Sequence, residues 1–142
     1  MSTAIFELPI RVYYEDTDAS GVAYHANYLR WFERGRTEWL RTLQLGQERM
    51  REELGTVFTV ASMEIAYRRP ARLDDLLQVQ TTVASVRRAS LVFEQRLKRT
   101  SDTELLASVA VKIGCVSFTD FRPAPMPAVM MEAIERWRLG GT

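Results

Sequence analysis

Residues 13–39 read YYEDTDASGVAYHANYLRWFERGRTEW, and the rest of the chain is organised around this stretch. Asp16, Asp18 and Ser20 make its first part polar. Apolar residues then recur in steps of three and four, at Tyr28, Phe32, Gly35, Trp39 and Leu43. This spacing predicts one face of an amphipathic helix of about four or five turns. The stretch is therefore predicted to run from a strand through a polar turn into a long helix, with Asn27 as the N-cap residue.

Gly35 lies inside this predicted helix, where a glycine costs roughly 1 kcal/mol relative to alanine. Such a residue indicates a place where the helix backbone lies very close to another part of the molecule. Three further apolar residues widen the apolar face of the helix, namely Leu29, Trp31 and Leu40. We therefore expect a sheet to cover much of the helix surface.

Five segments of the chain have the composition of β-strands. The first is residues 5–14, in which Ile10, Val12 and Tyr14 share one face. The other four are residues 56–68, 76–86, 90–98 and 104–118, which are rich in β-branched and aromatic side chains. Because the last three are joined by short turns, we expect antiparallel neighbours. The order β-α-β-β-β-β predicts an α+β domain with a sheet curled around the helix.

Glycine and proline mark the ends of the predicted helices. We expect the long helix to end near residues 43–45, with Gly46 as its C-terminal cap. A short polar helix over residues 47–54 would stop at Gly55. A closing helix is predicted to begin at Pro127, with Met130 and Ile134 on its buried face.

Length and composition limit the classes of protein to consider. With 142 residues, 46% of them hydrophobic, the chain is expected to form one domain, residues 1–142. A net charge of +1 argues against nucleic acid as the main partner. The single Cys115 excludes an internal disulfide, and one cysteine with one histidine cannot build a usual zinc site. We find no signal-peptide pattern and no apolar run of about 18 residues, so we expect a cytoplasmic protein without a transmembrane segment.

The segment YEDTDASGVAYHANYLRWFERGRTEWLR closely resembles the opening segment of the 4-hydroxybenzoyl-CoA thioesterase, or YbgC-like, hotdog family of acyl-CoA thioesterases. The motif residues are Tyr14, Asp18, Gly21, His25, Asn27 and Tyr28. The resemblance covers nearly the whole chain. It implies a hotdog fold, in which a five-stranded antiparallel sheet wraps around one long central helix. It also implies a homodimer with a continuous sheet, often paired again into a homotetramer.

Thioester cleavage needs a nucleophile, or a base that makes one, and a donor for the oxyanion. The resemblance implies that Asp18 is the catalytic carboxylate, acting either as a nucleophile through a mixed anhydride or as a base for water. It also implies active-site roles for His25 and Tyr14, and backbone N–H groups at residues 25–27 would polarise the carbonyl. The alternatives are a turn aspartate, a loop histidine held for structure and a tyrosine packed in the core. Asp16 fits the role of turn aspartate better than Asp18 does.

Two basic clusters could bind the phosphates of coenzyme A. Arg87 and Arg88 lie in a predicted turn between strands, and some members of the resembling family bind the nucleotide there. In those proteins a third cation follows, whereas here Ala89 stands at that position, so a solvated hairpin turn remains the alternative. A second cluster, Arg68, Arg69 and Arg72, has the same two interpretations.

Two functions from different classes follow. The first, which the resemblance implies, is an acyl-CoA thioesterase that uses Asp18 and needs no metal or cofactor. The sequence contains neither a GxSxG motif for a serine nucleophile nor a redox-cofactor fingerprint. The second is a binding module without turnover that holds acyl-CoA or acyl-carrier protein, or a scaffold linked to the cell envelope, as the resemblance to YbgC-like proteins implies. Nucleic-acid binding through the arginine clusters has no aromatic platform to support it.

Overall fold

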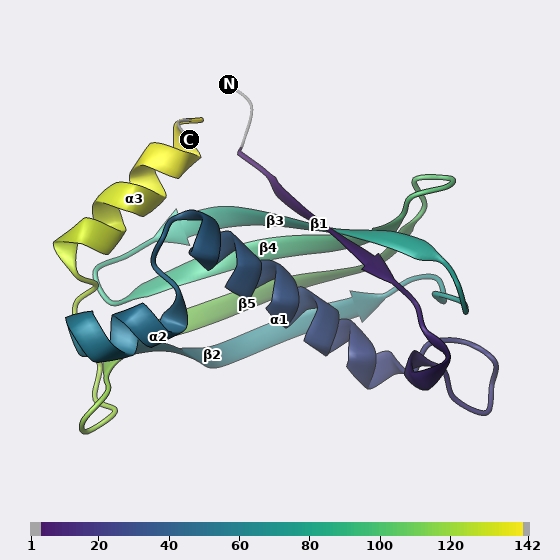
Figure 1. Cartoon of the computed structure of the whole chain (residues 1–142), viewed down its shortest axis with the longest axis horizontal. Coiled ribbons are helices and arrows are strands. Elements are labelled where there is room, and N and C mark those ends of the chain that lie inside the picture. Colours follow the sequence, from purple (N-terminus) through teal and green to yellow (C-terminus); the bar gives the residue numbers. More distant parts are fainter. Residues whose placement is uncertain (1–3, 141–142) are drawn as a thin grey trace.

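One long helix lies across one face of a five-stranded antiparallel sheet (Figure 1). The computed structural model describes residues 4–140. The elements in chain order are β1 (Phe6–Arg11), η1 (Tyr14–Asp16), α1 (His25–Thr42), α2 (Gln47–Arg49), η2 (Met50–Leu54), β2 (Thr56–Tyr67), β3 (Leu76–Val86), β4 (Ser90–Arg99), β5 (Leu105–Ser117) and α3 (Ala128–Arg138). The predicted order β-α-β-β-β-β is confirmed. Within residues 4–140, no helix combines the length and apolar character needed to cross a membrane.

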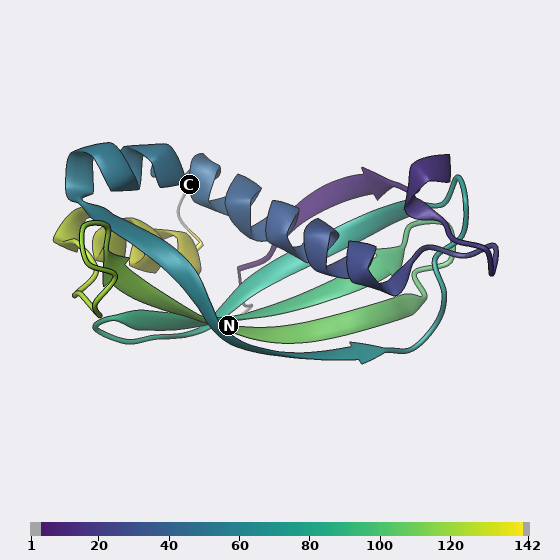
Figure 2. The same cartoon turned by 90° about the horizontal axis from the view of Figure 1, so that it is seen from below.

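The strands lie in the order β1-β3-β4-β5-β2, and every neighbouring pair is antiparallel. The register shifts between Val60 and Ser62 in β2, and between Val83 and Ser85 in β3. Such bulges increase the local twist of a sheet. Figure 2 shows the resulting curled sheet, with α1 in its concave side. The edges of the sheet are β1 and β2.

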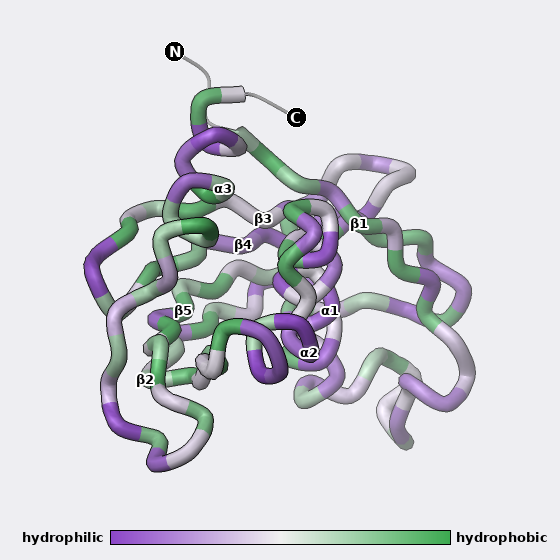
Figure 3. The backbone as a smooth tube through the Cα atoms, turned by 60° about the vertical axis from the view of Figure 1, so that its left-hand side comes forward, coloured by the Kyte–Doolittle hydropathy of each residue, from purple (hydrophilic) through white to green (hydrophobic). Residues whose placement is uncertain are grey.

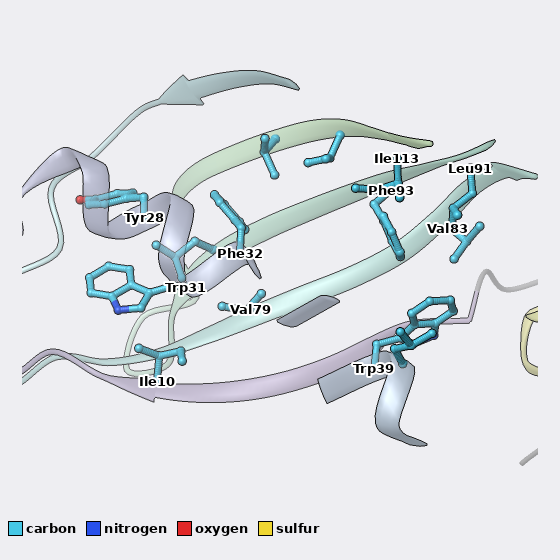
Figure 4. Close-up of a cluster of buried hydrophobic side chains, with 14 of the residues drawn as sticks. Ile10, Tyr28, Trp31, Phe32, Trp39, Val79, Val83, Leu91, Phe93 and Ile113 are labelled. Carbon is cyan, nitrogen blue, oxygen red and sulfur yellow. The ribbon is translucent and has the colours of Figure 1, made fainter. Parts of the chain in front are cut away.

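Gly35 is where the backbone of α1 comes closest to the sheet. A Cβ atom at this position would lie 2.7 Å from Val79 Cγ1 and 3.0 Å from Thr81 Oγ1. The close approach predicted from the glycine is therefore confirmed. Figure 4 shows the surrounding core, in which Phe32 and Trp39 from α1 lie among sheet residues that include Val79.

The ends of α1 differ from the prediction. The helix begins at His25 with Tyr24 as its N-cap, and Asn27 is a buried residue of the first turn whose Nδ2 donates to Asp16 O at 2.9 Å. The prediction of Asn27 as N-cap was wrong because its side chain binds this distant carbonyl. Gly46 does not cap the helix either, since Gln44 adopts the left-handed conformation with φ 60°. Gly46 instead precedes α2.

The first strand is shorter than predicted. It ends at Arg11, and the short helical turn η1 follows. Ile10 and Val12 are buried as expected, but Tyr14 is 82% exposed. Tyr14 therefore does not pack in the core, because the chain has left the strand direction before it.

The chain closes with α3, beside the end of α1. The helix begins at Ala128, one position after the predicted start, with Pro127 as its N-cap, and Met130 and Ile134 are fully buried. Its Trp137 ring lies edge-on to Trp39 at 5.5 Å between centroids. Figure 3 shows polar and apolar residues alternating along α1, as expected for a helix with one face on a sheet.

Candidate active site

Asp18 lies in a tight turn just before α1. Its Oδ1 accepts hydrogen bonds from the Ser20 backbone N–H at 2.8 Å and from the Ser20 hydroxyl. Gly21 N donates to Asp18 O at 3.0 Å, and Gly21 has φ 85°, a left-handed conformation that glycine adopts without strain. The carboxylate is exposed. The turn thus fixes Asp18 while leaving it open to solvent.

These contacts favour the ionised form of Asp18. The Ser20 hydroxyl and backbone N–H hold the pKa of the Asp18 carboxyl below its ordinary value, and the charge of His25 contributes in the same direction. Asp18 is therefore a carboxylate at neutral pH, the form that a nucleophile or general base requires.

Asp16 has a structural role, as predicted. Its Oδ2 accepts from Tyr13 N at 2.9 Å, and its backbone carbonyl accepts from Tyr24 N at 2.8 Å and from Asn27 Nδ2. Asp16 therefore ties the polar turn to the first turn of α1.

The first turn of α1 presents backbone donors. Asn27 N donates to Tyr24 O at 2.9 Å, so this N–H is already paired, whereas the prediction had it free. Across residues 4–140, no group accepts a hydrogen bond from His25 N or Ala26 N. Two N–H groups at the positive end of the helix dipole are thus left for an anionic or carbonyl oxygen.

His25 is held by its backbone, whereas its ring is exposed. Tyr67, the last residue of β2, donates its hydroxyl hydrogen to His25 O at 2.9 Å. The His25 ring lies 4.7 Å from the Tyr24 ring and edge-on to Tyr67 at 6.0 Å. Partial burial raises the pKa of the Tyr67 hydroxyl, so it stays protonated and remains a donor.

A pocket of about 270 Å³ opens at this helix start. It is lined by Val22, Ala23, His25, Tyr28, Tyr67, Arg68, Arg69 and Pro70. Tyr28 is fixed at its hydroxyl, which accepts from Ala71 N at 2.8 Å. Asp18 and Tyr14 are not among the lining residues, although Asp18 N donates to the carbonyl of the lining residue Val22 at 3.0 Å.

Sequence reasoning missed Tyr67, and it left Arg68 and Arg69 as one of two undecided basic clusters. The structure places both arginines in the pocket beside His25. Arg69 also pairs with Glu104, with 3.2 Å between Nε and Oε1. Pro70, three residues after the end of β2, is the sequence signal that the chain leaves the strand in this region.

Arg87 and Arg88 lie far from Asp18 within the chain. They form the turn between β3 and β4, where Arg87 N donates to Ser90 O and Met126 N donates to Arg88 O. Asp18 lies near the start of β3, since Val22 bridges to Arg72. The eleven residues of β3 separate the two places by roughly 35 Å. One chain does not bring them together.

Metal ligands do not cluster in the part of the chain that the structure describes. Among residues 4–140, no three His, Cys, Asp or Glu side chains are arranged to hold a metal ion.

Comparisons with known proteins identify the family of the chain. The Thioesterase-like superfamily matches residues 12–134. The acyl-CoA thioesterase YbgC of Haemophilus influenzae is 49% identical over 122 residues, covering 86% of this chain and 88% of that protein. The acyl-CoA thioester hydrolase YbgC of Escherichia coli O157:H7 is 45% identical over 127 residues, covering 89% and 93%.

Solved structures show the same fold. A probable thioesterase from Bartonella henselae has a TM-score of 0.82 at 34% identity, covering 87% of this chain and 100% of that one. A mutant 4-hydroxybenzoyl-CoA thioesterase complexed with 4-hydroxybenzoyl-CoA has a TM-score of 0.86 at 21% identity, covering 92% and 99%. The chain therefore belongs to the Thioesterase-like superfamily and has the hotdog fold.

Proposed function

We propose that the protein hydrolyses acyl-CoA thioesters to a carboxylic acid and coenzyme A. The observation that carries this proposal is the ionised Asp18 beside a helix start with two unpaired backbone N–H groups, at a pocket that can admit a small group. The relatives named as acyl-CoA thioesterases support the same chemistry.

The helix start would bind the carbonyl oxygen of the thioester. His25 N–H and Ala26 N–H would donate to this oxygen, and their hydrogen bonds would strengthen as negative charge develops on it. His25 is fixed at its carbonyl by Tyr67, so these donors need little rearrangement. The His25 ring and the exposed Tyr14 hydroxyl are proposed to orient the thioester or the attacking water.

Asp18 would act in one of two ways. As a nucleophile, its carboxylate attacks the carbonyl carbon, the C–S bond breaks and thiolate leaves, and water then hydrolyses the mixed anhydride. As a base, Asp18 takes a proton from the water that attacks the carbonyl directly; the C–S bond then breaks, and the leaving thiolate takes up that proton. Label found in Asp18 after a single turnover in ¹⁸O-labelled water would identify the nucleophilic route, because only that route lets water attack an Asp18 carbonyl.

We further propose that the working unit contains two chains joined along β2. This strand is an edge, and its Val60, Met63 and Tyr67 are 51%, 36% and 45% exposed. Pairing two exposed edges antiparallel would continue the sheet across both copies. The Tyr67 end of one β2 would then lie toward the Thr56 end of the other.

This pairing would also bring the second copy's basic turn closer. In each chain the turn at Arg87 and Arg88 lies at the Thr56 end of β2, since Cys115 N donates to Ala89 O and Thr56 pairs with Ser117. Arg87 and Arg88 of one copy would therefore share an end of the dimer with Asp18 of the other. We propose that they bind the nucleotide phosphates of coenzyme A there.

The alternative function is binding of acyl-CoA or acyl-carrier protein without turnover. One observation favours it, because Asp18 does not line the helix-start pocket. The deciding experiment is a panel of acyl-CoA substrates with detection of the released thiol. Turnover supports the thioesterase, whereas tight binding without thiol release supports the binding module.

A further inference from the structure

A second cavity lies between α1, α2 and β2, away from the helix start. Its volume is about 210 Å³, and it is lined by Glu33, Arg36, Thr37, Trp39, Leu40, Gln47, Phe58, Val60, Phe93 and Ile113. It shares no lining residue with the pocket at His25. At 1.5 Å per residue, Arg36 lies about 16 Å along α1 from His25. The two cavities are therefore separate sites within one chain.

Arg36 is a buried cation without an anionic partner. Only 9% of the residue is exposed. Its single hydrogen bond within residues 4–140 runs from Nη1 to Gln95 Oε1 at 3.0 Å, and no carboxylate there forms a salt bridge with it. Burial lowers the pKa of the Arg36 guanidinium, and the nearby charge of Glu33 only opposes this effect. A buried charge is normally paired, so Arg36 lacks a partner.

Gln95 offers Arg36 only one acceptor atom. Its Nε2 donates to Phe32 O at 2.8 Å and to Thr81 Oγ1 at 2.9 Å. Its Oε1 is the acceptor that Arg36 already uses. The remaining guanidinium N–H groups therefore have no acceptor in the described chain.

Trp39, another residue of the cavity wall, also carries an unpaired donor. The residue is fully buried, and its Nε1–H has no hydrogen-bond partner among residues 4–140. A buried indole N–H normally finds an acceptor. Because Trp39 has no accessible surface, its N–H does not reach a ligand in the cavity, and Arg36 is the unpaired donor that such a ligand would meet.

The rest of the cavity wall is mainly apolar. Phe58, Val60, Phe93 and Ile113 come from the sheet, and Leu40 comes from α1. We propose that this cavity binds the carboxylate of a short apolar acid, with the Arg36 guanidinium pairing with the carboxylate. Arginine pairs well with a carboxylate because its N–H groups match the two oxygens.

Glu33 sets the charge at the rim. It is exposed, and its Oε2 accepts from the Thr37 hydroxyl at 2.8 Å. Thr37 and Gln47, which also line the cavity, are neutral. The negative charge of Glu33 would repel a bound carboxylate and weaken its binding. Replacing Glu33 by a neutral residue should therefore strengthen carboxylate binding.

The cavity volume limits the ligand to a small one. Sites for drug-sized molecules begin at about 300 Å³. The cavity of about 210 Å³ equals the volume of about seven waters. Hexanoate, with one carboxylate and a five-carbon tail, is therefore a suitable probe.

The carboxylate could come from a free acid or from the far end of a substrate acyl group. A free acid would be the product class of the proposed hydrolysis. In the proposed β2 pairing, Phe58 and Val60 of one copy lie toward Tyr67 of the other. An acyl group bound at the helix start of one copy could therefore place a carboxylate at its far end beside Arg36 of the other copy. This second source rests on the proposed function, whereas the binding site itself does not.

Calorimetric titration of the full chain tests the site. We expect hexanoate to bind at least about tenfold more tightly than the neutral hexanamide, because only the carboxylate forms a charged pair with Arg36. Arg36→Met should remove this preference, and Glu33→Gln should strengthen hexanoate binding. Equal binding of hexanoate and hexanamide by the parent protein, or binding of neither, would overturn the proposal.

Removing a core guanidinium could unfold the chain, so two milder variants keep the test valid. Arg36→Lys keeps a cation at this position but loses the paired N–H groups of the guanidinium, and it should weaken hexanoate more than hexanamide. Glu33→Gln changes only an exposed side chain. If neither variant alters the preference for hexanoate, the carboxylate binds elsewhere and the proposal fails.

A kinetic comparison identifies the source of the carboxylate. If a substrate supplies it, adipoyl-CoA should be hydrolysed with a higher kcat/KM than hexanoyl-CoA, and hexanoate should compete with adipoyl-CoA. If a free acid supplies it, hexanoate should bind without such a preference. Hexanoate binding without hydrolysis of any acyl-CoA would reject the proposed function while supporting this site.

Discussion

Asp16 and Asp18 lie two residues apart, yet their carboxylates have different surroundings. Asp16 accepts the Tyr13 N–H and ties the turn to α1 through its carbonyl. Within residues 4–140 the Asp18 carboxylate accepts hydrogen bonds from Ser20 only, and the residue is exposed. The two residues therefore form a matched pair for separating chemistry from structure.

The first prediction concerns the Asp18 carboxylate. Asp18→Asn should lower kcat at least about 100-fold, roughly the effect of removing a positioned catalytic group, because the amide is neither nucleophile nor base. Substrate binding and the melting temperature should stay near those of the parent. Thiol release under saturating acyl-CoA measures the change.

Asp16→Asn is the control for this experiment. It removes the same charge, but the amide oxygen can still accept from Tyr13 N, so turnover should remain near the parent's. If Asp18→Asn also turns over at the parent's rate, Asp18 is not catalytic and the binding module becomes the better description.

The second prediction follows from the Asp18 pKa. The Ser20 contacts lower it from 3.8, so the ionised form is populated above the lowered pKa and is lost as the pH falls through it. Ser20→Ala removes the hydroxyl donor and raises the pKa back toward 3.8. The acid limb of the kcat/KM profile should therefore move to higher pH. An unchanged acid limb would show that the Ser20 hydroxyl does not control this titration.

At the scale of the element, strands were easier to predict than helix ends. The structure confirms β3 over residues 76–86 as predicted, and β2, β4 and β5 within one residue at each end. A strand buried on one face carries its period in its own residues. The start of α1 depends instead on Asp16, whose carbonyl holds Asn27 from eleven residues away. Capping rules consider only neighbouring residues, so they cannot predict such a contact.

The site was predictable only in part for a related reason. Asp18 and His25 lie on one continuous segment, so their association follows from the chain itself. Tyr67 reaches His25 from the end of β2, which requires the helix to cross the sheet at one angle and β2 to occupy the edge. Neither the crossing angle nor the strand order can be predicted from the local pattern of residues.

The third prediction tests the contact between α1 and the sheet. Gly35→Ala gains helix propensity of about 1 kcal/mol, but its Cβ would lie 2.7 Å from Val79 Cγ1. Overpacking of this kind costs about 1–3 kcal/mol, so a net loss of stability is expected. Denaturant unfolding measures it. The control is Gly114→Ala in β5, where the nearest atom is 3.9 Å away and little change is expected.

At the scale of the whole molecule, the exposed edge of β2 should determine assembly. We expect light scattering to give at least twice the chain mass of 16.3 kDa wherever turnover is seen, with a tetramer the expected state. Met63→Glu puts like charges on both copies at the proposed junction and should give monomers with little activity. A fully active monomer would contradict the shared site.

The last prediction concerns the distance between the two ends of the sheet. Arg87 and Arg88 cannot reach the nucleotide of a substrate bound at Asp18 of their own chain, so any contribution must come across the dimer. Arg87→Ala with Arg88→Ala should raise KM for acyl-CoA more than it changes kcat, because phosphate contacts far from the thioester stabilise ground and transition states alike. Arg96→Ala removes another exposed arginine, from β4, and should leave KM unchanged. Mixing the double variant with Asp18→Asn should give hybrid dimers in which one of the two sites contains both intact Asp18 and intact Arg87 and Arg88. Recovery of parental KM in that mixture would place the arginines in the second chain, whereas KM unchanged in the double variant would identify the turn as a solvated hairpin.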